Sequence, residues 1–154
     1  MDGRQLADEL TEARATFMAT LDRVIAERGP DARVTGEWGV RELVAHLGYW
    51  AGHAAEAIHA VEQGRADEFE VGDREVEARN ETVARVARET NLATVRRREA
   101  ASVEALLERL RGIDPSLLGT QLASWGSLHD GIREDGAVHY GDHAADLGGG
   151  ADAA

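Results

Sequence analysis

Proline, the residue that most strongly breaks helices, occurs only twice in this chain of 154 residues. Long stretches rich in Ala, Glu, Arg and Leu, which are strong helix formers, make up much of the rest. The chain is close to the commonest length of a single domain. We therefore expect an all-α fold with one core over residues 1–147 and a disordered tail at 148–154, where glycine and alanine dominate.

Apolar residues spaced three and four apart mark the expected helices, and glycine or proline marks their ends. This pattern predicts helices over 4–28, 40–63, 73–89, 92–112 and 131–147. The third and fourth segments form one helix or two, depending on whether Thr90 and Asn91 interrupt the chain. We expect a long irregular loop over 113–130, and because long loops in compact domains are often functional, Trp125 within it is a candidate cover for a site.

The charge of the chain argues against a nucleic-acid partner. Twenty-nine acidic residues against 17 basic ones give a formal net charge of -12, which repels a phosphate backbone. The first residues do not show the basic segment followed by an apolar segment that is typical of a secretory signal peptide. The sequence also has no run of about eighteen apolar residues, the length needed to span a membrane. We therefore expect no membrane span and a cytoplasmic location. Because the chain contains no cysteine, any thiol chemistry would use a thiol from solution.

Two histidines near the end of the chain have the spacing of metal ligands. His139 and His143 are four residues apart, so on a helix both imidazoles project from one face. Taken alone, such a pair is more often two surface histidines near a frayed helix end. Asp146, three residues further, is a candidate hydrogen-bond acceptor for a ligand imidazole, or a solvated carboxylate. Tyr140 stands where a metalloprotease HExxH helix carries its glutamate base, which argues against a protease.

The second predicted helix carries another candidate ligand, His46, which lies on one helical face with Tyr49, Trp50 and His53. Beside leucines, a single histidine such as His46 is often an ordinary core residue. His53 lies two turns away, too far to share an ion with His46 easily, so we expect it to line a pocket at most. Trp50 is a core anchor or part of an aromatic wall beside a metal, and Tyr49 would extend that wall.

The string EWGVRELVAHLGYW, with Trp38 eight residues before His46, resembles the helix-two signature of the DinB-like superfamily. That superfamily includes YfiT, the N-terminal region of mycothiol-dependent maleylpyruvate isomerases, and the ClbS/DfsB proteins. The resemblance implies a four-helix bundle with non-consecutive topology and a long loop before the last helix. It also implies a metal site formed by His46, His139 and His143. The isomerases are similar but carry glutamate as the middle ligand, so His139 weakens that particular assignment.

Three activities follow as expectations from this resemblance. The first is a metal-dependent S-transferase, in which zinc or nickel activates a low-molecular-weight thiol of the mycothiol or bacillithiol type to attack a small-molecule electrophile. The second uses water instead, so that the protein hydrolyses or sequesters a reactive small molecule. The third is a non-catalytic bundle that binds a metal or ligand. A homodimer is compatible with each of the three.

Overall fold

The computed structural model describes residues 1–69 and 73–153, and nearly all of its regular structure is helical, which confirms the all-α prediction. The helices are α1 (Gly3–Arg28), α2 (Val40–Glu62), α3 (Asp73–Arg88), α4 (Leu92–Gly112), α5 (Leu128–Asp135) and α6 (Ala137–Ala153). In the described residues, no helix is both long and apolar enough to cross a membrane.

Short elements join the helices. Two antiparallel hairpins, β1 (Arg33–Thr35) with β2 (Trp38–Gly39) and β3 (Gln121–Leu122) with β4 (Gly126–Ser127), precede α2 and α5. Two 3-10 turns, η1 (Ala66–Glu68) and η2 (Pro115–Gly119), follow α2 and α4. Each hairpin leads directly into a helix, so the α1–α2 and α4–α5 connections consist largely of short regular elements.

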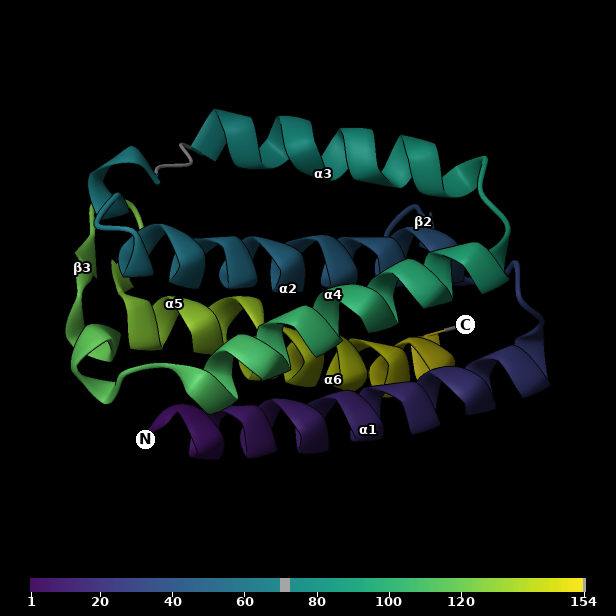
Figure 1. Ribbon diagram of the computed structural model, residues 1–154. Helices are drawn as coiled ribbons and strands as arrows, with labels where there is room; N and C mark the ends of the chain where they lie inside the picture. The colour runs from purple at the N-terminus through teal and green to yellow at the C-terminus, as the bar shows by residue number, and fades with distance from the viewer. Residues whose placement is uncertain (70–72, 154) are drawn as a thin grey trace.

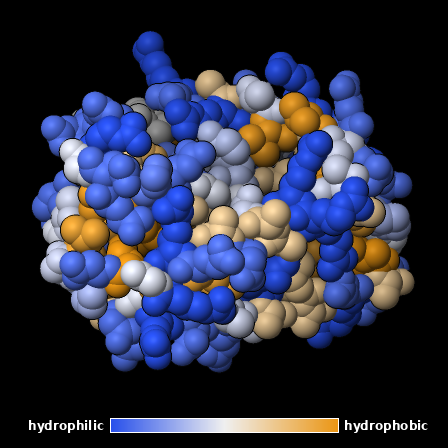
Figure 2. Space-filling model, viewed as in Figure 1, coloured by the Kyte–Doolittle hydropathy of each residue, from blue (hydrophilic) through white to orange (hydrophobic). Residues whose placement is uncertain are grey.

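The helices lie roughly parallel or antiparallel to one another, and the main contacts join helices that are distant in sequence (Figure 1). Helix α2 packs chiefly against α4, and α1 packs chiefly against α6. Helix α1 also contacts α4, while α5 contacts α2 and leads into α6. Helix α3 packs along the outer side of α2. In the same view, the surface of the molecule is mainly hydrophilic, with patches of apolar residues (Figure 2).

The core forms where α1, α2, α4 and α6 meet. Its largest fully buried apolar side chains come from all four helices and include Phe17, Leu21, Leu43, Leu47, Leu106, Leu110 and Leu147. The helical periodicity of the first predicted helix is confirmed, because Leu6, Leu10, Phe17, Leu21 and Val24 are all buried. Burying one such side chain contributes about 1.5–3 kcal/mol, so this core is the main source of stability.

A buried polar cluster crosses the core and ties three helices together. Glu99 on α4 is 1% exposed. Its carboxylate accepts hydrogen bonds from Arg14 Nε on α1, at 2.8 Å, and from the Tyr140 hydroxyl on α6, also at 2.8 Å. Behind Glu99, α2 and α4 approach so closely that a Cβ at Gly48 would lie 2.8 Å from Glu99 Cα. A side chain at position 48 would therefore push these helices apart.

The end of the chain differs from the sequence prediction. The predicted loop over 113–130 contains η2, the hairpin β3/β4 and the start of α5. The predicted helix over 131–147 is two helices, because the chain turns at Gly136, where a Cβ would lie 2.7 Å from the Ile132 carbonyl oxygen. Helix α6 also continues past Leu147 to Ala153, over much of the predicted tail at 148–154. Glycine weakens a helix by about 1 kcal/mol without forbidding it, and no proline ends α6 at Leu147. Residue 154 lies outside the described residues.

Helices α3 and α4 are separate, which settles the alternative left open at Thr90 and Asn91. Helix α3 ends at Arg88, and the Asn91 side chain caps α4 by accepting a hydrogen bond from the Thr94 amide at 2.9 Å. This cap satisfies one of the free amides at the helix start and is typical of asparagine.

Replacing Glu99 with alanine should destabilise the fold strongly. The change leaves the Tyr140 hydroxyl and Arg14 without their buried acceptor, and breaking a buried pair costs about 3–5 kcal/mol. Because the Arg14 side chain is 30% exposed, we expect a loss near the lower end of that range. The matched control is Glu104→Ala, also on α4, whose exposed pairing with Arg111 at 3.8 Å should contribute less than about 1 kcal/mol. Urea unfolding measures both, and equal losses would contradict the prediction.

Candidate metal site and adjoining pocket

The first candidate ligand, His46, is fixed by the structure at the start of α2. The Gly39 amide donates a hydrogen bond to Glu42 Oε2 at 2.5 Å, which caps the helix. The ring of Trp38, on β2, lies 4.8 Å from the His46 ring between centroids. Strand β1 of the same hairpin packs against α6. The hairpin therefore holds the beginning of α2 beside the helix that carries the other two histidines.

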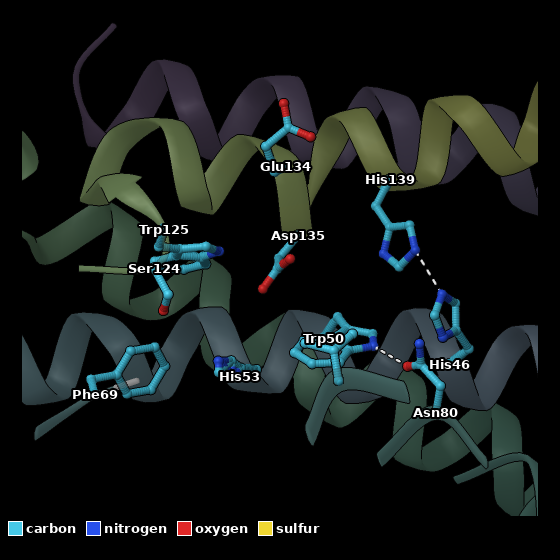
Figure 3. A pocket seen from close by; sticks show the side chains of 11 residues that line it. His46, Trp50, His53, Phe69, Asn80, Ser124, Trp125, Glu134, Asp135 and His139 are labelled. Carbon is cyan, nitrogen blue, oxygen red and sulfur yellow. Dashed lines mark hydrogen bonds between the residues drawn. The ribbon is translucent and has the colours of Figure 1, made fainter. Parts of the chain in front are cut away.

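The structure brings His46, His139 and His143 together, although the first is more than ninety residues from the others. Their potential ligand atoms all lie within 4.8 Å of one another. The Nε2 atoms of His46 and His139 are 2.8 Å apart, a hydrogen-bond distance, and point toward each other, with the two ring planes 79° apart (Figure 3). The His143 ring lies 4.9 Å from that of His139 and 5.5 Å from that of His46, between centroids.

These three side chains fit a divalent transition-metal ion. The Nδ1 atoms of all three are buried and have no hydrogen-bond partner. Burial, followed by the charge of His143, lowers the pKa of His46 to about 4. Burial, followed by the charges of His46 and His143, lowers the pKa of His139 to about 3. His46 and His139 are therefore neutral at pH 7, the form in which imidazole binds zinc or nickel.

Asp146 lies beside the site but does not complete a hydrogen bond to it. Its Oδ2 atom is 3.2 Å from His143 Nδ1. That nitrogen nevertheless has no properly aligned partner, and the Asp146 side chain is 54% exposed. The distance is short enough for a hydrogen bond, but the geometry of donor and acceptor does not allow one. Asp146 therefore lies near His143 without fixing the orientation of its ring. Its role in orienting a ligand stays a prediction.

A cavity of about 310 Å³ adjoins His46 and His139, between α2 and the α5–α6 segment. Aromatic rings form much of its wall (Figure 3). The His53 ring is 4.4 Å from that of Phe69, 5.0 Å from that of Trp50 and 5.9 Å from that of Trp125, between centroids. Three of the side chains expected in a pocket, Trp50, His53 and Trp125, thus line the same cavity.

Each of the two tryptophans of the cavity has a contact that fixes its position. Trp50 Nε1 donates a hydrogen bond at 2.7 Å to Asn80 Oδ1 on α3. The indole of Trp125 lies directly on Gly131, where a Cβ would be only 2.1 Å from Trp125 Cδ2. Glycine at 131 therefore allows the hairpin to place Trp125 over the cavity.

Tyr49 lies outside this cavity, although it neighbours Trp50 in sequence. Its hydroxyl accepts a hydrogen bond from Arg79 at 3.1 Å, and its ring lines a different cavity between α2, α3 and α4. Successive residues on a helix point about 100° apart, which sends Tyr49 toward α3.

Asp135 is a pocket residue that the sequence reasoning missed. It is the last residue of α5 and lines the cavity. Its Oδ2 atom is buried without a hydrogen-bond partner. Burial, with a smaller contribution from Glu134, raises the pKa of Asp135 to about 7. Helical spacing gave no valid signal for it, because the chain turns at Gly136, between Asp135 and His139.

Comparisons of the chain with protein-family models, with curated proteins and with solved structures find no match.

We expect the untagged protein to bind about one zinc or nickel ion per chain, because three imidazoles converge. His139→Ala removes the ligand next to both other histidines and should weaken metal binding at least about 100-fold. Even mutation of a residue that only hydrogen-bonds to a metal ligand typically lowers the metal affinity about 10–100-fold. His59→Ala, an exposed histidine on α2, is the matched control and should bind normally. Elemental analysis and a competition titration measure both. A wild-type protein that stays metal-free in excess zinc and nickel would contradict the assignment.

His53 should make the chelator-treated protein sensitive to acid. Burial, followed by the charge of Arg79, lowers the pKa of His53 from 6.5 to about 4. Between those values the unfolded chain takes up a proton that the folded one does not. The free energy of unfolding therefore falls as pH falls through this window, by at most about 1.4 kcal/mol per pH unit from this residue.

His53→Gln should reduce this slope, and His59→Gln on the same helix should leave it as in the wild type. Urea unfolding between pH 4.5 and about pH 7.5 measures the difference. Parallel pH profiles for the wild type and His53→Gln would show that burial of His53 does not oppose protonation.

Proposed function

We propose that this protein is a DinB-like, metal-dependent enzyme that transfers a low-molecular-weight thiol to an electrophilic small molecule. The observation that carries the proposal is the convergence of His46, His139 and His143 beside a cavity lined by aromatic rings. A ligand site next to a pocket of this kind places a reactive centre where a small organic molecule can be held.

The arrangement of the helices supports the DinB-like part of the proposal. Helices α1, α2, α4 and α6 share one core, and α1 packs against the last helix rather than against the next one in sequence. The resembling string EWGVRELVAHLGYW ends the β1/β2 hairpin and begins α2, so His46 stands two turns into that helix. The remaining ligands come from the first two turns of α6.

The residues of the site suit activation of a thiol. A divalent ion held by the three histidines would supply a Lewis acid that lowers the pKa of a coordinated thiol or water toward neutrality. His46 and His139 are neutral ligands, so they would not reduce the positive charge of the ion. Because the chain has no cysteine, the thiol would enter from solution.

The aromatic walls would hold the electrophile close to that thiol. Trp50 is fixed by its hydrogen bond to Asn80, and Trp125 by its contact with Gly131, which limits the rearrangement needed for binding. In the reaction, the thiol sulfur forms a bond to an electrophilic carbon and the thiol proton passes to solvent. The leaving group departs with the electron pair of the broken bond.

Thiol transfer can be measured with the metal-loaded protein, monobromobimane as electrophile, and mycothiol, bacillithiol or cysteine as thiol. We expect conjugate formation above the uncatalysed rate, reduced at least about 100-fold in His143→Ala because one of three ligands is lost. His59→Ala should retain the full rate. Hydrolysed product in the absence of thiol would assign water as the nucleophile instead. Metal binding without turnover of any such electrophile would favour a non-catalytic binding protein.

A further inference from the structure

In the metal-free protein, the wall of the cavity beside the histidines carries carboxylates but no permanent positive charge. Its acidic residues are Asp135, whose side chain points into the cavity, and the exposed Glu134, whose carboxylate points away from it (Figure 3). Among the described residues that line it, none is an arginine, and the sequence contains no lysine. Three histidines, His46, His53 and His139, also line it. Without a bound metal ion, the permanently charged groups of this wall favour a cation over an anion.

The carboxylate of Asp135 is particularly poorly compensated. It ends α5 at the turn before Gly136 and points into the cavity, where its Oδ2 atom is buried without a hydrogen-bond partner (Figure 3). The negative end of the α5 dipole lies at the same place and disfavours a second negative charge. The nearest basic residue in sequence, Arg133, is engaged elsewhere, because its Nε donates to Glu9 Oε1 on α1 at 2.8 Å. A buried carboxylate in this state favours a positively charged partner.

Aromatic rings stand on the other sides of the same space. Trp50, Phe69 and Trp125 line the cavity together with Asp135, and the Phe69 and Trp125 rings are 5.9 Å apart between centroids. The faces of tryptophan and phenylalanine attract cations, most strongly where water is excluded. We infer that this cavity binds an organic cation, a small molecule whose ammonium group lies between the aromatic rings and the Asp135 carboxylate.

The cation is the electrophilic substrate of the proposed reaction. The cavity extends from Asp135 to His46 and His139, so a ligand anchored by its ammonium group presents its other end to the histidines. A volume of about 310 Å³ is at the small end of the range for ligand pockets, which limits the substrate to a compact molecule. This identification of the cation as substrate rests on the proposed function, whereas its binding needs no metal.

Binding can be tested on the chelator-treated full chain with choline and benzyltrimethylammonium as probes. The titration is done at pH 8, above the pKa of about 7 to which burial raises Asp135, so that its carboxylate is ionised. The neutral control is 3,3-dimethylbutan-1-ol, which replaces the ammonium nitrogen of choline with carbon. We expect choline to bind at least about tenfold more tightly than this alcohol, with a change in tryptophan fluorescence.

Asp135→Asn keeps the size of the side chain and should weaken binding of both cations about tenfold or more. Asp142→Asn removes the same charge from an exposed position on α6 and should bind as the wild type. Both variants should fold, by circular dichroism, and still bind one metal ion per chain. Equal affinity for choline and its alcohol analogue, or unchanged affinity in Asp135→Asn, would overturn the inference. Thiol transfer would then still stand. If the cations bind but the metal-loaded protein forms no thiol conjugate, the inference stands and the proposed function is contradicted.

Discussion

The buried contact among Arg14, Glu99 and Tyr140 connects the core to the candidate site. Tyr140 follows His139 directly, and its hydroxyl donates to Glu99 on the opposite side of α6 from the histidines. Glu99 in turn packs against Gly48, two residues after His46. Glu99 thus sets the position of α2 through its backbone and the start of its side chain, and that of α6 through its carboxylate. The separation of His46 and His139 depends on both contacts. Such a network is costly to bury unless every member is satisfied, which gives the packing a single arrangement.

Local signals in the sequence were sufficient to predict most helices. The predicted segments 4–28, 40–63 and 92–112 agree closely with α1, α2 and α4, because glycine, proline or a capping residue stands at their ends. The turn at Gly136 was not predictable in the same way. Several glycines occur in that part of the chain, and the sequence does not distinguish the one at which the helix is interrupted.

The candidate site, too, could be predicted only in the parts that depend on local sequence signals. The spacing of His139 and His143 can be read from the sequence, since it depends only on the geometry of one helix. Joining them to His46 required the resemblance, because nothing local relates α2 to α6. Asp135 was not predictable, because its environment depends on the turn between α5 and α6, which no local signal marks. Phe69 was missed because it lies in the connection after α2, where no periodicity marks a buried face.

The contact between Trp125 and Gly131 also limits how this protein can change during evolution. Any side chain at 131 would occupy the space of the indole, with its Cβ 2.1 Å from the ring. A mutation at 131 is therefore tolerated only after Trp125 has become smaller or has moved. In related sequences the two positions should vary as a pair, and a lineage that lost the tryptophan would be free to accumulate larger residues at 131. The outline of the pocket would then drift while the histidines on α2 and α6 stayed the same.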